Sequence, residues 1–201
     1  MTDPLHALID VGARFDRQGF VPATSGNFSV REGDGCWITA SGRHKGRLLA
    51  TDFVRVGADG ELLERRSGDA RPSAETSIHL AVYRAEPKAQ VVLHIHELHG
   101  TLLSLKDAVA RAPWRVELPS LEILKAFGSH PSDRKLAVDV FQNHHHVPDI
   151  ARDVSRHYAG RSPEVPGFLI EGHGLTAWGE SLERAEFAVE AFVFLFRAMR
   201  G

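Results

Sequence analysis

The segment that most constrains the fold is 90–96, Gln-Val-Val-Leu-His-Ile-His. Its apolar, β-prone positions predict a strand that runs into two histidines. Because successive side chains of a strand point to opposite faces, His94 and His96 share one face. Two imidazoles at a rigid strand end can form part of a metal site, and zinc with three protein ligands is the usual catalytic arrangement. Taken alone, however, such a pair is more often two polar residues at a strand end.

Strands paired in hairpins occupy the first part of the chain, and strands alternate with helices later. Glycine-containing turns at 33–35 and 58–60 separate the strands of two predicted hairpins. The expected strands are 27–31, 36–39, 53–56, 61–63, 90–96, 114–118, 136–141, 168–170 and 175–178. The expected helices are 4–18, 73–84, 97–106, 121–127, 149–158 and a last helix from 181. We therefore predict a single α/β domain over residues 1–201, with a central, mostly antiparallel sheet flanked by helices.

The last predicted helix is apolar on more than one face. Phe187, Phe192 and Phe194 project from different sides of it, among several valines and leucines. A helix of this kind is buried all round or is covered by a neighbouring subunit.

Composition excludes several classes of protein. The 201 residues are 43% hydrophobic and 25% charged, as in ordinary globular proteins, and the net charge of −2 does not favour binding to nucleic acid or to an anionic membrane. No apolar run approaches the roughly 20 residues of a membrane span, and no secretion signal is visible at the start of the sequence. The single cysteine, Cys36, rules out an intramolecular disulfide and fits a reducing compartment. We expect a cytoplasmic protein.

Several histidines compete to be the third metal ligand. His173 is the best candidate, because a bulky ring between two glycines at the tip of a predicted hairpin needs a reason, although a turn histidine is more often simply solvated. His99 is a rival, but it falls in the following helix and points in another direction. His79 is expected on a helix flank and His44 in a loop. The run 144–146 points in divergent directions and is read as a solvated turn.

Two acids, Glu75 and Glu122, lie in the first turns of predicted helices. An acid at that position interacts favourably with the helix dipole, and this local role explains each of them on its own. A metal enzyme also needs a group that transfers protons, so at least one acid is expected near the metal.

Two loops, 24–27 and 40–43, are rich in glycine, serine and asparagine, and their backbone N–H groups can bind an anion. Lys45 and its neighbours add positive charge beside the second loop, and Ser73 adds a further donor. Together these groups make a plausible phosphate site, although neither loop is a P-loop and each alone is more often an ordinary turn.

Read together, these segments resemble the class II aldolase/adducin family over nearly the whole chain. Within the family, the sequence is most similar to members that remove water from a sugar phosphate. This closer likeness rests on the segments 41–48 and 121–127 and on the helix that follows Ser73. The family motifs, in order, are Thr24-Ser-Gly-Asn-Phe-Ser, Thr39-Ala-Ser-Gly, Pro72-Ser-Ala-Glu-Thr, His94-Ile-His and Glu171-Gly-His-Gly-Leu-Thr-Ala-Trp-Gly.

The resemblance implies a three-layer α/β/α fold and one zinc ion per subunit, held by His94, His96 and His173. It implies a homotetramer with active sites near subunit contacts, which would cover the apolar last helix. It also implies a sugar-phosphate substrate. The residues expected to bind its phosphate are Gly26, Asn27, Ser41, Gly42, Ser73 and Lys45.

The resemblance assigns different roles to the two acids. Glu122 matches the acid/base of the dehydrating members. Glu75 matches the catalytic, metal-neighbouring glutamate of the sugar-phosphate aldolases, a position where some dehydrating members carry cysteine. The alternative of an aldolase that cleaves a ketose 1-phosphate therefore stays open. A non-catalytic interaction module, as in adducin, is less favoured because the histidine set is complete.

Overall fold

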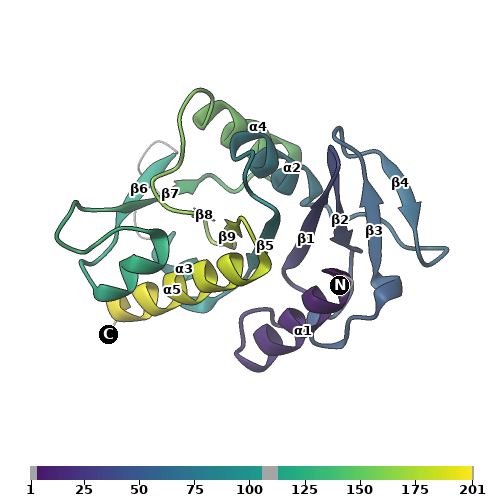
Figure 1. Cartoon of the computed structure of the whole chain (residues 1–201), viewed down its shortest axis with the longest axis horizontal. Helices are drawn as coiled ribbons and strands as arrows, with labels where there is room; N and C mark the ends of the chain where they lie inside the picture. The colour runs from purple at the N-terminus through teal and green to yellow at the C-terminus, as the bar shows by residue number, and fades with distance from the viewer. Residues whose placement is uncertain (1–3, 106–112, 201) are drawn as a thin grey trace.

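The computed structural model describes residues 4–105 and 113–200, which form one nine-stranded sheet with helices on both faces (Figure 1). The strands lie in the order β4-β3-β2-β1-β5-β9-β8-β7-β6. Among the described strand pairs only β7 and β8 are parallel, so the predicted mostly antiparallel α/β fold is confirmed. The predicted domain bounds, 1–201, extend beyond the described residues at both ends and stay a prediction.

The elements follow the predicted order. The strands are β1 (Asn27–Glu32), β2 (Gly35–Thr39), β3 (Phe53–Val56), β4 (Leu62–Arg65), β5 (Val91–Ile95), β6 (Trp114–Glu117), β7 (Ala137–Phe141), β8 (Gly167–Ile170) and β9 (Gly174–Gly179). The helices are α1 (Pro4–Arg17), α2 (Thr76–Ala85), α3 (Leu98–Leu103), α4 (Val147–His157) and α5 (Leu182–Arg200). In the described part of the chain, three 3₁₀ helices connect them: η1 (Lys45–Arg47), η2 (Ala50–Asp52) and η3 (Glu122–Phe127).

Two hydrophobic cores lie on opposite faces of the sheet. One packs the sheet against α1, α3, α5 and η3, and the other packs it against α2 and α4. Strand β5 contributes Leu93 to the first core and Val92 to the second, as expected for alternating side chains. His94 therefore points to the face that α2 covers. These layers confirm the three-layer arrangement.

Three helix predictions differ from the structure in type or by about three residues at one end. The helix expected at 97–106 is the shorter α3, which ends at Leu103, and residue 106 lies outside the described residues. The helix expected at 121–127 is the 3₁₀ helix η3, and Gly128 ends it with φ of 75°. A six-residue segment is short enough for this tighter geometry. The helix expected from Ser73 begins at Thr76, because the Thr76 N–H donates to the Ser73 carbonyl and closes a turn first. Glu75 is thereby the N-cap residue of α2.

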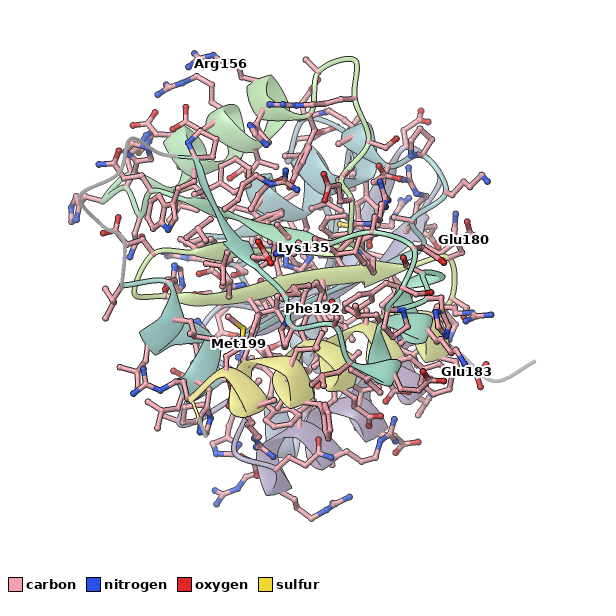
Figure 2. All side chains as sticks on the ribbon, turned by 90° about the vertical axis from the view of Figure 1, so that its left-hand side faces the viewer. Lys135, Arg156, Glu180, Glu183, Phe192 and Met199 are labelled. Carbon is pink, nitrogen blue, oxygen red and sulfur yellow. The ribbon has the colours of Figure 1, made fainter. Side chains whose placement is uncertain are left out.

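The last helix, α5, packs against the sheet along one face only. Figure 2 shows Phe192 on the side of α5 that faces the sheet, where it is fully buried. Phe187 and Phe194, by contrast, are 43% and 56% exposed. The described residues of this chain therefore leave part of the apolar surface of α5 uncovered. None of the described helices is long and apolar enough to cross a membrane.

Candidate metal centre

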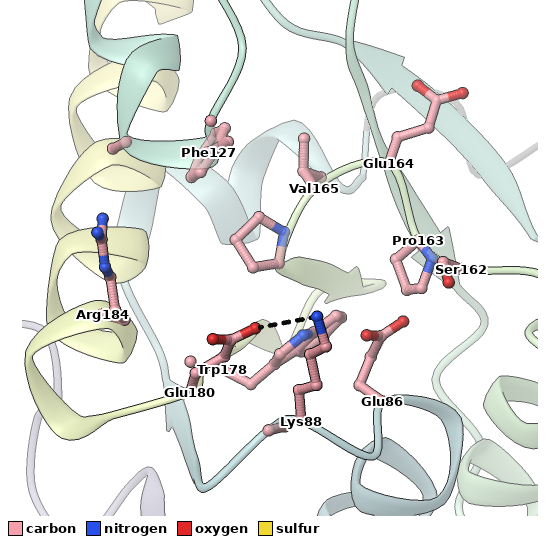
Figure 3. Close-up of a pocket in the computed structure, with 15 residues that line it drawn as sticks. Glu86, Lys88, Phe127, Ser162, Pro163, Glu164, Val165, Trp178, Glu180 and Arg184 are labelled. Carbon is pink, nitrogen blue, oxygen red and sulfur yellow. Dashed lines mark ion pairs between the residues drawn. The ribbon is translucent and has the colours of Figure 1, made fainter.

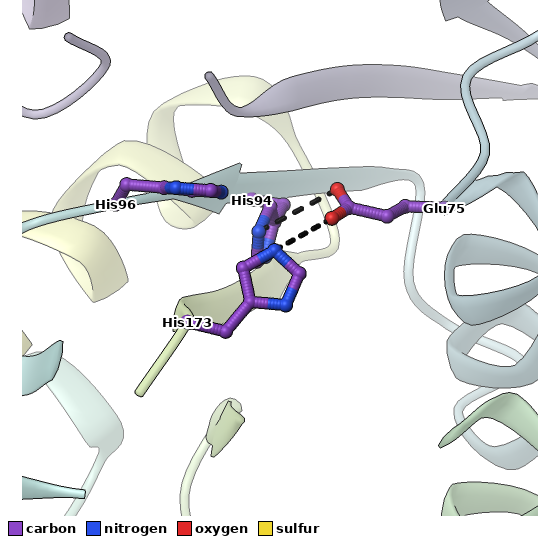
Figure 4. A group of neighbouring side chains, drawn as sticks. All are labelled: Glu75, His94, His96 and His173. Atoms are coloured by element: carbon purple, nitrogen blue, oxygen red, sulfur yellow. Dashed lines mark ion pairs between the residues drawn. The ribbon is translucent and has the colours of Figure 1, made fainter. Parts of the chain in front are cut away.

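The three predicted ligands His94, His96 and His173 come together with Glu75 at one end of β5 (Figure 4). One potential ligand atom from each of the four residues lies within 4.8 Å of those of the other three. The ring centroids of the three histidines are 4.7 to 5.0 Å apart, with the ring planes nearly perpendicular. The rings thus surround a common point at which a cation could be held.

The sheet fixes the position of His94. Strand β5 lies between β1 and β9, and the register sets Asn27 on one side of His94 and Thr176 on the other. Directly opposite residues of paired strands present their side chains on the same face, so all three point toward α2. His96 follows the end of β5, and His173 lies in the turn between β8 and β9.

Two glycines let the neighbouring segments approach the end of β5. A Cβ at Gly174 would lie 2.1 Å from the Ile95 carbonyl oxygen, and one at Gly26 would lie 2.7 Å from the His94 carbonyl oxygen. Gly26 also has φ of 73°, which residues with a side chain rarely adopt. Because both positions exclude a side chain, the His173 turn and the 24–27 loop can lie close to the histidine cluster.

The imidazole nitrogens are arranged as metal ligands require. Nδ1 of His94 lies 3.0 Å from the Thr176 hydroxyl, whereas its Nε2 is buried without a hydrogen-bond partner. When Nδ1 donates its proton to Thr176, Nε2 has a free lone pair, and this is the outer hydrogen bond that orients metal-bound histidines. His173 faces the cluster with its Nε2, which lies 2.7 Å from Glu75 Oε1. The residues present therefore fit a metal ion.

Burial and neighbouring groups set protonation states in the cluster that favour binding of a cation. Burial lowers the pKa of His94 to about 3 and that of His96 to about 4, so both rings are neutral at neutral pH. Burial opposes ionisation of Glu75, but His94, His173 and the Asn27 amide outweigh it and hold its pKa well below the usual range. Three imidazoles and one carboxylate form a donor set that suits a divalent transition metal.

The predicted phosphate-binding residues line a cavity of about 290 Å³ beside the cluster. Glu75 and His96 form part of its wall, so the cavity adjoins the candidate metal position. The side chain of Lys45 is buried and donates to the carbonyls of Thr24 and Arg43 at 2.6 and 2.5 Å. Burial lowers the pKa of Lys45 to about 8. The predicted residues in this lining are Gly26, Asn27, Ser41, Gly42, Ser73 and Lys45.

Glu122 lies outside this cluster. Its side chain is 70% exposed at the start of η3, where it pairs with Lys125 and lies 3.9 Å from His130. Within one chain the structure therefore separates the two predicted acids, and the catalytic role of Glu122 stays a prediction.

The competing histidines also lie outside the cluster. His99 contacts Glu97 at 2.6 Å at the start of α3, and His144 contacts Asp153 at 2.8 Å. His44 accepts a hydrogen bond from the backbone of Gly46. His79 lies on a helix, α2, as predicted, and its side chain is fully buried.

Three contacts that support the cluster are absent from the sequence predictions. Asn27, expected only to bind phosphate, also donates to Glu75, and Thr176 contacts His94. His79 contacts the amide oxygen of Asn27, whose amide nitrogen contacts Glu75. Two spacings could have signalled this arrangement: Asn27 and Ser29 share one strand face, and Glu75 and His79 are i, i+4 neighbours on one helix face.

A second cavity, of about 480 Å³, lies at the opposite ends of β5 and β9 (Figure 3). Its lining combines Glu86, Lys88 and Glu180 with Trp178, and none of the predicted site residues contributes to it. Lys88 and Glu180 pair across it at 4.0 Å. Its charges are of both signs, and one carboxylate oxygen of Glu86 is buried without a hydrogen-bond partner, unlike the converging imidazoles at the other end of the sheet.

Comparison with known proteins agrees with this geometry. The chain is 44% identical over 190 residues to a methylthioribulose-1-phosphate dehydratase of Leptospira biflexa, covering 92% of this chain and 90% of that protein. It is 40% identical over 198 residues to one of Microcystis aeruginosa, covering 98% and 95%. The structure of L-fuculose-1-phosphate aldolase from Thermus thermophilus matches with a TM-score of 0.75 and 26% identity, covering 99% of this chain and 95% of that one. Residues 6–199 match the Class II Aldolase and Adducin N-terminal domain, and the chain belongs to this family.

Proposed function

We propose that the protein is a zinc-dependent dehydratase that converts 5-methylthioribulose 1-phosphate to 2,3-diketo-5-methylthiopentyl 1-phosphate. The observation that supports this most is the convergence of three histidines and Glu75 beside a cavity lined by the six predicted phosphate-binding residues. The relatives with 44% and 40% identity bear the name of this activity. The same proposal assigns the protein to methionine salvage in the cytoplasm.

The proposed cofactor is one zinc ion per chain, bound by His94, His96 and His173. When bound, zinc acts as a Lewis acid that stabilises the negative charge developing on the substrate ketone and its neighbouring hydroxyl. The Thr176 contact supports this assignment, because it orients His94 with its free nitrogen toward the cluster.

The substrate phosphate is proposed to bind where the two glycine-containing loops meet Ser73. Backbone N–H groups in such loops favour anions, and the Lys45 ammonium lies in the same cavity lining. A phosphate held there would direct the sugar carbons toward the cluster, since Glu75 and His96 form the adjoining wall.

The reaction needs two proton transfers. A base removes the C3 proton, which is acidic because it is α to the C2 ketone, and an acid protonates the C4 hydroxyl as it leaves as water. The resulting enol then tautomerises to the diketone. Glu75 is poorly suited to be the base, because its pKa is held low and base strength falls with pKa. We assign the proton transfers to Glu122 and the support of the metal site to Glu75.

This assignment requires Glu122 to reach the site of another copy, since it lies outside the cluster of its own chain. We therefore propose a homotetramer with its active sites at subunit contacts. The surface next to the cluster supports this. Leu98 of α3 and Leu105, just after α3, are 62% and 48% exposed, and Thr101 of α3 donates to the His173 carbonyl at 3.3 Å. Exposed leucines beside a polar site suit burial by a second copy.

Subunit mixing tests the proposed arrangement. Chains with Glu122→Gln and chains with His173→Ala should each be inactive alone. Co-expressed mixed assemblies should regain activity, because an intact Glu122 of one chain then faces an intact metal site of another. Activity of the mixture no higher than that of the separate variants would place both groups in one chain and contradict the proposal.

Product identity tests the reaction. Purified protein with about one zinc per chain should convert 5-methylthioribulose 1-phosphate to the diketone. Cleavage of a ketose 1-phosphate to dihydroxyacetone phosphate and an aldehyde, without diketone formation, would favour the aldolase alternative. Absence of bound divalent metal would instead favour the non-catalytic module.

A further inference from the structure

A stripe of polar side chains on α2 continues inward from the candidate metal centre. Glu75, His79 and Tyr83 are spaced four residues apart, so they lie on one face at the start and along the length of the helix. This face packs on β1, where Asn27 and Ser29 point toward it. His79 and Ser29 are fully buried, in a layer otherwise filled by the apolar core under α2 and α4.

The side chains of this stripe form a continuous hydrogen-bonded chain. Asn27 Nδ2 donates to Glu75 Oε2, and His79 Nε2 lies 2.6 Å from Asn27 Oδ1. On the other side of the ring, His79 Nδ1 lies 2.7 Å from the Ser29 hydroxyl. The Ser29 hydroxyl in turn lies 2.8 Å from the Tyr83 hydroxyl. We call these five residues the Glu75 chain.

The chemistry of the groups fixes the direction of each bond. An ionised carboxylate only accepts, so Asn27 must present its amide N–H to Glu75 and its carbonyl oxygen to His79. His79 Nε2 must then carry the ring proton, which leaves Nδ1 to accept from Ser29. Ser29 has then used its proton, so its oxygen accepts from Tyr83. All four donors thus point toward Glu75.

His79 stays neutral in this arrangement, as the directions require. Burial lowers its pKa to about 4, only partly offset by the negative charge of Glu75. At neutral pH the ring therefore has one donor and one acceptor, and both are used. Hydrogen bonds aligned in one direction polarise one another, so each strengthens the next toward the carboxylate.

We propose that His79 is a positioning residue for the metal centre: it fixes the orientation of the Asn27 amide, which in turn holds the Glu75 carboxylate at the histidine cluster. Without a donor at His79, the amide of Asn27 can rotate and present its oxygen to Glu75, which repels it. This inference rests on the proposed metal site, but it does not depend on which reaction the site catalyses.

The test is zinc affinity, measured by competition with a chelating dye, in a double-mutant cycle. His79→Phe keeps an aromatic ring, of somewhat larger size, and removes both hydrogen-bonding nitrogens, so zinc affinity should fall about 10–100-fold, as for other partners of metal ligands. In the Glu75→Gln background the same substitution should change affinity by less than about threefold, because its effect passes through Glu75.

Two further variants separate positioning from folding. Leu80→Ala, a buried neighbour on α2 outside the Glu75 chain, should lower the thermal stability of the metal-free protein and leave zinc affinity unchanged. His79→Gln retains an amide donor and should recover part of the affinity. If His79→Phe does not fold, His79→Leu, which also removes both nitrogens, replaces it.

The outcomes are distinguishable from failure of the proposed function. An equal loss of affinity with and without Glu75, or no loss on His79→Phe, would overturn the positioning role. Wild-type protein that binds zinc tightly but forms no diketone would contradict the proposed reaction and leave this inference intact.

Discussion

Glu75 and Glu122 occupy similar positions in the sequence but opposite environments in the structure. Each opens a helical segment in the sequence, and the helix dipole explains either one locally. The structure buries the Glu75 side chain to 12% exposure among three histidines, whereas that of Glu122 is 70% exposed beside Lys125. The same local signal therefore accompanies a carboxylate of the candidate metal centre in one case and a surface acid in the other.

The difference comes from what each segment packs against. The start of α2 lies over the sheet where β1, β5 and the His173 turn meet, so Glu75 faces histidines. The 3₁₀ helix η3 instead packs on α5 through buried Leu124 and through Phe127, whose ring centroid is 4.6 Å from that of Phe192. With these apolar residues turned inward, Glu122 faces outward.

The largest expected effect tests whether Glu122, and not Glu75, transfers protons. Glu122→Gln should lower kcat by about 10²–10⁴-fold, the usual contribution of general acid–base catalysis, with about one zinc per chain retained. Steady-state kinetics and metal analysis of the same preparation measure both quantities. Near-normal turnover would indicate that Glu75, and not Glu122, carries out the proton transfers.

Glu75→Gln should have the converse effect. The amide keeps the shape but removes the negative charge that attracts the cation, so zinc affinity should fall about 10–100-fold. Chelator competition at neutral pH measures it, and Glu122→Gln is the matched control with unchanged affinity. Equal zinc affinity in the two variants would mean that Glu75 does not support the metal.

Each acid has a lysine nearby, Lys45 near Glu75 and Lys125 near Glu122, and the pH dependence of kcat/KM distinguishes the two lysines. Burial lowers the pKa of Lys45 from 10.5 to about 8, so its charge is present below pH 8 and is lost as the pH rises through that value. Because that charge attracts the substrate phosphate, kcat/KM should decline severalfold above pH 8. Lys45→Met should have low kcat/KM at every pH and lack this decline, whereas Lys125→Met should retain the decline above pH 8. A wild-type profile that is flat from pH 7 to 9 would contradict the role of Lys45.

The smallest expected effect concerns stability. The Glu122 side chain is exposed, so Glu122→Gln should leave the free energy of unfolding nearly unchanged. Urea unfolding of the zinc-free protein measures the change. A markedly larger loss would show that the Lys125 and His130 contacts of Glu122 have a structural role.

The strands of the fold were predictable because their signals are local. Alternating side chains and glycine turns predict all nine described strands to within two residues at each end. The Gly-His-Gly turn also identifies His173 as a candidate for the cluster. These signals depend only on neighbours in the sequence, so a single sequence contains them.

The partners across the sheet could not be predicted in the same way. Spacing indicates that Asn27 and Ser29 share one strand face, but not that β5 lies beside β1 or that α2 covers that face. The burial of His79 and its contact with Asn27 depend on both facts. The order of strands results from packing of the whole chain, and a local pattern does not report it.

The position of His94 between β1 and β9 has a consequence for how the protein is made. Its contact with Thr176 joins residues 82 positions apart, and that of Asn27 with Glu75 joins residues 48 positions apart. Closing such long loops is costly in entropy and slow, so contacts of this kind form late in folding. During synthesis the complete cluster cannot form until β9 has left the ribosome. Zinc uptake during refolding would therefore report completion of the sheet, after the hairpins and helices have formed.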